Sequence, residues 1–372
     1  MHRPDTHTTM TDETYPNPAP IPDPYAPQPG YVPPLEPAAP APEAPADAGT
    51  SGYIPALPLA ELRDTADRLR AEVQKVIVGQ EKVLDLLLIA MLSDGHVLIE
   101  GMPGLAKTLT AKLLARTVDT GFSRIQFTPD LMPSDVIGTS VFDPRTSTFE
   151  FKAGPIFSNI ILIDEINRAP AKTQSALFES MEERQVTVDG HTYPLGTPFM
   201  VVATQNPIEH EGTYRLPEAQ LDRFLFKVDI GYPTVDDEVA LMLRSQEGAQ
   251  RLTVEHIRPV ISPAELERAR MLVRGVRCDE KLVRYIADII HATRNDRALM
   301  LGASPRASLA ILRSSKSAAA IQGRDFVVPE DIQLVLTPVL RHRILLTPER
   351  EMEGLRPDEV VAQFIAKVPV PR

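Results

Sequence analysis

The chain has 372 residues and a formal net charge of −11, with a pI near 5.3. So acidic a chain is a poor candidate for general affinity toward nucleic acid or anionic lipid. Its one cysteine, Cys278, excludes an internal disulfide framework and fits a reducing cytosol.

No charged segment followed by an apolar segment marks a signal peptide. The longest apolar stretch, 83–92, is interrupted by Asp85 and is too short to span a bilayer. We therefore expect a cytoplasmic protein without a transmembrane segment.

Residues 1–52 are rich in proline and alanine and poor in large aliphatic residues. Such a segment cannot bury enough surface to offset chain entropy, so we predict a disordered, partly polyproline tail. The stretch 27–31 could bind a partner, although a solvated tail is the simpler interpretation. Folded structure is expected from about Pro58, with helices over 59–76 and 81–91.

The next segment has the pattern of a phosphate-binding loop. An apolar strand over 96–99 is followed by Gly101 and Gly104, and a helical stretch begins at Lys107. Glycines let backbone N–H groups turn toward a phosphate, and a helix N-terminus adds partial positive charge. Strand, tight loop and helix are the context that such a loop requires.

Two side chains at the start of this helix have the chemistry of nucleotide binding. Lys107 would reach the β- and γ-phosphates, and Thr108 would place its hydroxyl on Mg²⁺. Ala106 stands where glycine is usual, which suits alanine if its φ is negative, and Pro103 stiffens the loop. The alternative is an ordinary glycine-containing turn with a solvated lysine.

A second motif follows at a continuous apolar strand over 159–163, which ends in Asp164 and Glu165. Such a strand is typical of a parallel sheet buried on both faces. Asp164 would hold the Mg²⁺ shell, and Glu165 would polarise the attacking water. The alternative is a strand that simply meets solvent at two acids, but open α/β sheets bind ligands at this end of their strands.

The remaining pattern alternates strands and helices up to about residue 230 and is helical beyond 232. The Asp189-Gly190 pair is a strong two-residue hairpin turn. Strands are predicted over 124–127, 199–203 and 225–230, and hairpins over 141–151 and 185–193. Helices are predicted over 235–248, 262–275, 279–294, 304–321 and 329–340. We expect a tail over 1–52, a nucleotide-binding core with inserted hairpins over 58–231 and a helical lid domain over 232–372.

Four segments in this order resemble the MoxR family of AAA+ ATPases: the phosphate loop, 164–169, 204–207 and 216–224. The resemblance covers roughly residues 60–370 and includes Ala106. It implies an α/β fold. The AAA+ P-loop NTPase core is a five-stranded parallel sheet with helices on both faces, joined to a C-terminal helical lid.

The resemblance also implies roles for individual residues. Asn206 would be the sensor that orients water, Arg223 the arginine finger that acts on a neighbouring subunit, and Arg306 the second sensor. A loop cap before Pro207 and an ion pair of Arg223 with Asp222 are the structural alternatives for the first two. Nucleotide contacts are expected at Val78, Gly79, Gln80, Gly101, Pro103, Gly104, Leu105, Ala106, Lys107, Thr108 and Leu109. The hairpins over 138–151 and 185–193 would face the pore of a ring, or they are ordinary surface hairpins.

The function implied is a ring-forming, hexameric ATPase that uses ATP and Mg²⁺ to remodel, mature or assemble partner proteins. A von Willebrand factor A domain protein is the implied partner. The alternatives are a magnesium-chelatase-like motor subunit, a nucleic-acid-acting ATPase and a nucleotide-gated scaffold. The acidic chain shows no basic domain for nucleic acid, and a scaffold has no need of Glu165.

Overall fold

The computed structural model describes residues 59–102, 104–206, 214, 216–246 and 254–371. The predicted tail over 1–52 lies outside the described residues. In the part of the chain that is described, no helix is long and apolar enough to cross a membrane.

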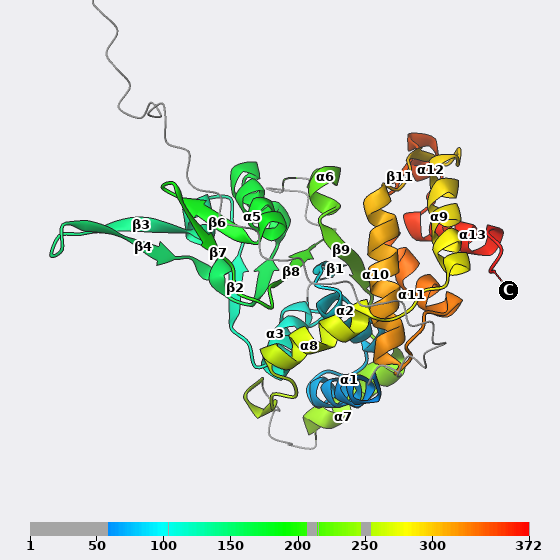
Figure 1. The fold of residues 1–372 in the computed structure, drawn as a ribbon, viewed down its shortest axis with the longest axis horizontal. Coiled ribbons are helices and arrows are strands. Elements are labelled where there is room, and N and C mark those ends of the chain that lie inside the picture. The colour runs from blue at the N-terminus through cyan, green and yellow to red at the C-terminus, as the bar shows by residue number, and fades with distance from the viewer. Residues whose placement is uncertain (1–58, 103, 207–213, 215, 247–253, 372) are drawn as a thin grey trace, which may run out of the picture. The chain divides into compact units, whose positions relative to one another are not determined.

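A five-stranded sheet forms the centre of the fold, with the strand order β2-β5-β8-β1-β9 (Figure 1). All four pairings are parallel, which confirms the expected parallel sheet. The strands are β1 (His96–Gly101), β2 (Phe122–Gln126), β5 (Ile160–Asp164), β8 (Met200–Gln205) and β9 (Phe224–Ile230). Because all five strands run parallel, their carboxyl ends lie at one edge of the sheet, which is where open α/β sheets bind ligands.

The sheet is buried on both faces because successive side chains point to opposite sides. On β1, Val97 and Ile99 join one apolar cluster and Leu98 joins the other. The first cluster packs under α1 (Leu59–Gln74), α2 (Glu81–Leu92) and α3 (Lys107–Thr117), and the second packs under α4 (Pro133–Ile137) and α5 (Ala171–Glu183). The sequence prediction does not include α4 and α5, although the apolar spacing of Leu177, Phe178 and Met181 is helical.

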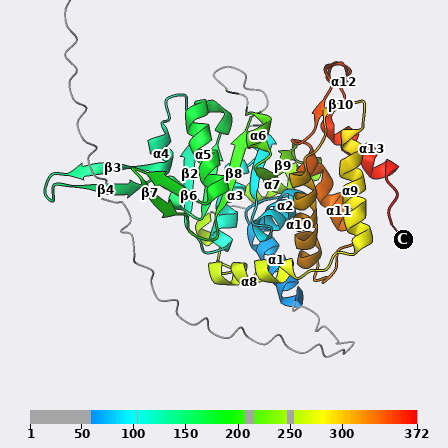
Figure 2. The same cartoon turned by 45° about the horizontal axis from the view of Figure 1, so that its top comes forward.

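Both predicted hairpins are confirmed. Strands β3 (Gly138–Asp143) and β4 (Thr148–Ala153) pair antiparallel, as do β6 (Gln185–Val188) and β7 (His191–Pro194). Asp189 and Gly190 both have positive φ, 50° and 78°, as the predicted Asp-Gly turn requires. The longer hairpin extends well beyond the sheet (Figures 1 and 2), and Phe151 on β4 stacks on Tyr193 of β7 with ring centroids 4.2 Å apart.

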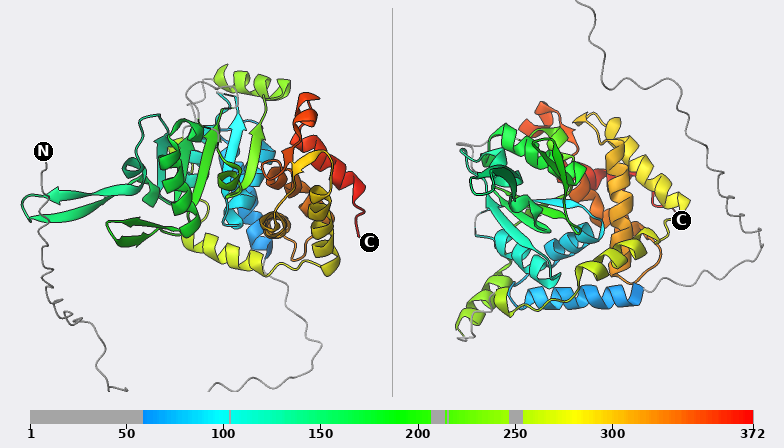
Figure 3. Two further views of the ribbon diagram at one scale, coloured as in Figure 1. Left: turned by 90° about the horizontal axis from the view of Figure 1, so that it is seen from above. Right: turned by 60° about the vertical axis from the view of Figure 1, so that its left-hand side comes forward.

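The chain beyond β9 is helical, as predicted. The five predicted helices are α7 (Val235–Gln246), α8 (Pro263–Arg274), α9 (Glu280–Arg294), α10 (Pro305–Ile321) and α11 (Pro329–Leu340). Elements not predicted are α6 (Glu218–Leu221), α12 (Pro348–Met352), α13 (Pro357–Lys367) and the short strands β10 (Leu299–Leu301) and β11 (Leu345–Leu346). Buried side chains of α8–α11, α13 and β11 continue the apolar cluster of α1–α3, and α10 runs through the middle of the helical layer beside α11 (Figures 2 and 3).

Candidate functional site

The predicted phosphate loop lies between the end of β1 and the start of α3. Position 101 lacks room for a side chain, because a Cβ there would lie 2.8 Å from the carbonyl oxygen of Ile230. Gly104 has φ +85° and faces open space, which is the conformation that turns backbone N–H groups inward. Pro103 lies outside the described residues.

The expectation of a negative φ at Ala106 is wrong. Its φ is +56°, in the left-handed region, directly before the first residue of α3. The residue is held there because its carbonyl oxygen accepts the first bond of the helix, from the N–H of Thr110 at 2.9 Å. The cost of this conformation is about 1–2 kcal/mol for an L-residue, and alanine has the smallest side chain that incurs it.

Lys107 and Thr108 are the first two residues of α3. The Lys107 ammonium donates a hydrogen bond of 2.7 Å to the carbonyl oxygen of Gly101, so the lysine curls back over its own loop. The side chain therefore lies along the concave face of the loop, next to the N-terminus of an eleven-residue helix. A cation and a helix N-terminus together suit a polyphosphate.

Asp164 ends β5 and is the centre of a polar cluster. Its carboxylate lies 3.3 Å from the Thr108 hydroxyl and 3.1 Å from the Thr204 hydroxyl on β8. It also accepts a 2.7 Å bond from Arg124 on β2. One carboxylate beside a hydroxyl is a donor set that Mg²⁺ uses together with substrate phosphates and water, and the Arg124 guanidinium shows that the carboxylate accommodates a positive charge.

Glu165 follows in a left-handed conformation, with φ 57°, so its side chain diverges from that of Asp164. Its carboxylate accepts a 2.7 Å bond from Gln126 and pairs with Arg168 at 3.0 Å. Its backbone N–H donates to the Thr204 hydroxyl at 3.1 Å. Thr204 thus connects both acids, and Arg124, which bonds Asp164, also bonds Gln126 at 3.1 Å, so one polar network holds the two carboxylates.

Two further predicted segments reach the same end of the sheet. Asn206 comes directly after β8 and is buried. Gln80 donates its side-chain N–H to the carbonyl oxygen of Leu105 at 3.2 Å, which fastens the 78–80 segment to the phosphate loop. Gly79 packs so closely on Asp237 of α7 that a Cβ would lie 2.8 Å from its carboxylate.

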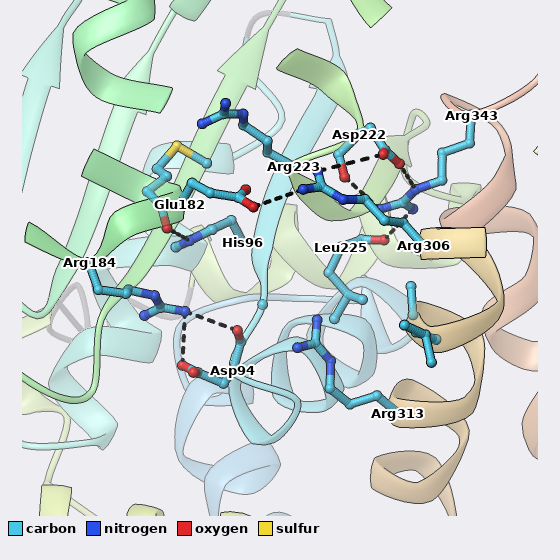
Figure 4. Close-up of a pocket in the computed structure, with 14 residues that line it drawn as sticks. Asp94, His96, Glu182, Arg184, Asp222, Arg223, Leu225, Arg306, Arg313 and Arg343 are labelled. Carbon is cyan, nitrogen blue, oxygen red and sulfur yellow. Dashed lines mark hydrogen bonds and ion pairs between the residues drawn. The ribbon is translucent and has the colours of Figure 1, made fainter. Parts of the chain in front are cut away.

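Arg223 and Arg306 lie elsewhere. They line a pocket of about 330 Å³ together with Gly95 and His96 at the start of β1 (Figure 4). The phosphate loop follows the other end of this six-residue strand, and six residues of strand span about 20 Å. The structure therefore brings the two arginines together and separates both from the phosphate loop of their own chain.

Contacts inside this arginine pocket hold both side chains. Arg306 pairs with Glu182 of α5 at 2.9 Å and lies 3.9 Å from the Asp222 carboxylate. The Arg223 guanidinium donates to the carbonyl oxygen of Phe178. Figure 4 shows Arg313 and Arg343 entering the same pocket, so the pocket has an excess of cationic groups suited to an anionic ligand.

The sequence prediction missed several of these side chains. They are Arg124, Gln126, Arg168, Glu182, Thr204, Asp222 and Arg343. Thr204 and Asp222 stood inside segments already singled out, so their positions gave a signal. Arg124 and Arg343 gave none, because each acts through a contact with a residue distant in sequence.

The comparisons with known proteins agree with this geometry. Residues 96–226 match the ATPase family associated with various cellular activities (AAA), and 291–364 match the AAA lid domain. The chain is 43% identical over 317 residues to Chaperone MoxR1 of Mycobacterium tuberculosis, covering 83% of each protein. It is 45% identical over 299 residues to protein YeaC of Bacillus subtilis, covering 80% of this chain and 92% of the relative.

A solved structure is similar as well. A putative ATPase from Cytophaga hutchinsonii superposes with a TM-score of 0.78 at 42% identity, over 84% of this chain and 97% of the other.

Proposed function

Because this chain belongs to the MoxR family of AAA+ ATPases, we propose that it hydrolyses ATP with Mg²⁺ at a site shared between neighbouring subunits of a ring. The observation that carries the proposal is the cluster at the carboxyl ends of β5 and β8. There one carboxylate, Asp164, contacts the phosphate-loop hydroxyl of Thr108 and the Thr204 hydroxyl that also holds Glu165.

Each residue of this end has a definite task in the proposal. Lys107 binds the β- and γ-phosphates, and Thr108 and Asp164 hold Mg²⁺, which neutralises charge on the phosphate oxygens when bound. Glu165 takes a proton from the attacking water, and Asn206 orients that water. The purine and the phosphates are contacted by Val78, Gly79, Gln80, Gly101, Pro103, Gly104, Leu105, Ala106 and Leu109.

Arg223 and Arg306 act on the neighbour's nucleotide in this proposal. Their distance from the phosphate loop of the same chain supports a shared site, since a strand's length separates them. A surface rich in arginine is complementary in charge to the phosphate-loop surface of a neighbour once a triphosphate occupies that loop. Repeated contact of this head-to-tail kind closes into a ring, and a planar guanidinium spreads well over transition-state charge.

The biological task that we propose is the remodelling, maturation or assembly of partner proteins by a hexamer in the cytoplasm. The relative named Chaperone MoxR1 supports a chaperone role. A von Willebrand factor A domain protein is the proposed partner, and the two hairpins β3–β4 and β6–β7 are proposed to face the pore. The proposed lid domain begins near residue 232, and the two matched families lie on either side of that boundary.

A mixing experiment tests the shared site. Arg223→Ala should bind ATP nearly normally and lose about 100-fold or more in hydrolysis rate, since a finger is worth at least that much. Glu165→Gln should also be inactive. A mixture of the two should regain activity, because an interface between a subunit with intact Glu165 and a neighbour with intact Arg223 is complete.

The rate of the unmixed protein supplies the second measurement. The wild-type rate per subunit should rise with protein concentration through the range in which subunits assemble. Subunit exchange is followed alongside with two fluorescent labels, so that slow mixing is recognised. Rates independent of concentration, with no recovery in exchanged mixtures, would refute the shared site and leave Arg223 with a structural role.

A further inference from the structure

Arg343 is the most buried of the arginines that line the arginine pocket. It follows the end of α11, and its side chain is only 4% exposed. Its guanidinium donates five hydrogen bonds: to the Asp222 carboxylate (2.6 Å), and to the carbonyl oxygens of Asp222 (3.0 Å), Phe224 (2.6 Å), Leu225 (3.1 Å) and Val339 (2.7 Å). Figure 4 shows it between α11 and the start of β9.

Four of these five bonds go to the segment 222–225, which contains Arg223. The bonds reach both residues that flank Arg223 in the chain. The preceding residue, His342, also donates through Nε2 to the carbonyl oxygen of Phe224 at 3.0 Å. The backbone that carries Arg223 is therefore held from one side by the end of α11.

Asp222 extends this contact to α10. One of its carboxylate oxygens bonds Arg343, and the other lies 3.9 Å from Arg306. A single carboxylate thus contacts arginines from two helices of the C-terminal region and is the chain neighbour of Arg223. A shift of the end of α11 would displace this short segment, because Arg343 holds it with four hydrogen bonds.

Packing alone does not require an arginine at this position. A well-packed apolar side chain usually stabilises a buried site at least as well as an ion pair does, because taking charges out of water is costly. A guanidinium offers instead five donors in fixed directions in one plane. At Arg343 four of these hydrogen bonds fix the positions of backbone carbonyl groups, and the fifth holds the Asp222 carboxylate.

We propose that Arg343 is a positioning residue for the shared hydrolysis site: it fixes segment 222–225, so that Arg223 meets the neighbouring subunit's triphosphate at the correct angle. The proposal rests on the proposed function, in which Arg223 is the finger. A displacement of about 1 Å in a catalytic group can cost on the order of 100-fold in rate. Arg343 thereby connects the orientation of α11 to ATP hydrolysis in the neighbouring subunit's site.

The test is a double-mutant cycle between Arg343→Lys and Arg223→Ala. Lysine keeps the charge but offers one ammonium group in place of the planar fork. Arg343→Lys should keep ATP affinity and lose about tenfold or more in hydrolysis rate. Added to Arg223→Ala, it should cause almost no further loss, because its effect acts through a finger that is already absent.

Complementation gives a readout that a purely structural role would not produce. Mixed with Glu165→Gln, Arg343→Lys should recover activity as a finger-defective subunit does. Mixed with Arg223→Ala, it should not recover, because both subunits lack a working finger. A loss that multiplies fully with that of Arg223→Ala, or a single variant with near wild-type rate, would overturn the proposal.

Arg341→Lys is the matched control. Arg341 joins the same end of α11 to the other end of β9, through 2.7 Å pairs with Asp229 and with Asp358 of α13. It should retain most of the hydrolysis rate even if its melting temperature falls as much as that of Arg343→Lys. An equal rate loss in both variants would mean that the junction of α11 matters in general, and would reject a specific role for Arg343.

Asp222→Asn keeps the proposal testable if Arg343→Lys does not fold. It removes the charged partner from the other side of the same contact, and it enters the same cycle with the same expectations. Failure of the proposed function and failure of the positioning role of Arg343 give different results. Full activity of Arg223→Ala alone would refute the proposed function, whereas an active-site role for Arg223 with full additivity would refute only the positioning role.

Discussion

The two ends of the central sheet hold their charged side chains in different ways. At the phosphate-loop end, Asp164 is paired with Arg124, whose side chain is 53% exposed. At the other end, Arg343 is 4% exposed and makes five hydrogen bonds. Exposed pairs contribute little free energy and exchange easily with solvent ions, whereas breaking a buried pair strands a charge.

This difference indicates which half of the proposed site exchanges its contacts when a ligand binds. Polar groups at the phosphate-loop end, such as Lys107, are satisfied by contacts that a bound ligand can replace. At the arginine end, Arg343 is buried and donates mainly to backbone carbonyl oxygens, and Arg223 donates to the carbonyl oxygen of Phe178. A shared site needs both properties, because one half must admit and release nucleotide while the other must keep its geometry.

Lys107→Ala should have the largest effect, because it removes nucleotide binding and with it hydrolysis, whereas Glu165→Gln removes hydrolysis alone. The phosphates lose their main point charge, and losing hydrogen bonds to charged groups should weaken ATP binding by about 100-fold or more. Isothermal titration measures the affinity directly. Lys112→Ala, on the exposed side of the same helix, is the control and should bind normally; unchanged affinity of Lys107→Ala itself would remove the phosphate-loop assignment.

Glu165→Gln should separate binding from chemistry at the same end. The amide cannot accept the proton of the attacking water, so the hydrolysis rate should fall by about 10²- to 10⁴-fold while ATP affinity is kept. A phosphate-release assay and a binding titration on one preparation measure both. Glu179→Gln, an exposed change on α5, should be silent. Hydrolysis near the wild-type rate in Glu165→Gln would assign the base to another residue.

How much of the structure the sequence predicts depends on how far apart in the chain the interacting residues lie. The hairpin turn at 189–190 depends on two adjacent residues, and the buried strand before Asp164 on local hydrophobicity, so both were predictable. The positive φ of Ala106 depends on how the loop joins α3. The separation of Arg306 from its own phosphate loop, and the grip of Arg343 on 222–225, depend on the packing of segments more than a hundred residues apart.

Acid should weaken the arginine end through two buried histidines. Burial, and then the charge of Arg184, lowers the pKa of His96 to about 3. Burial, and then the charge of Arg343, lowers the pKa of His342 well below its usual range. A histidine with a lowered folded-state pKa stabilises the fold above its unfolded-state pKa, about 6.5, and loses that contribution as the pH falls.

The free energy of unfolding should therefore drop between pH 7 and pH 5, by about 2 kcal/mol through His96 and by a further amount through His342. Urea denaturation at both pH values measures the drop. In His342→Gln, whose amide can still donate to the carbonyl oxygen of Phe224, the drop should be smaller than in the wild type. An identical pH dependence in wild type and variant would show that His342 does not contribute in this way.

Arg124→Gln should have the smallest effect, and it compares the exposed arginine of the phosphate-loop end directly with the buried Arg343. The Arg124 guanidinium bonds the Asp164 carboxylate at 2.7 Å, so it competes with a bound cation for that carboxylate. An exposed ion pair is worth about 0.2–1 kcal/mol. Its removal should therefore lower the Mg²⁺ concentration needed for half-maximal nucleotide binding by only about 1.4- to fivefold, measured by titrating Mg²⁺ against a fluorescent ATP analogue. The rate at saturating Mg²⁺ should change little.

Arg124→Gln, which removes a charge, should then reduce the hydrolysis rate less than Arg343→Lys, which keeps one, because only the second arginine is held by buried backbone. A large loss of rate in Arg124→Gln would instead make Arg124 part of the proposed catalytic cluster, and both ends of the sheet would then carry fixed arginines.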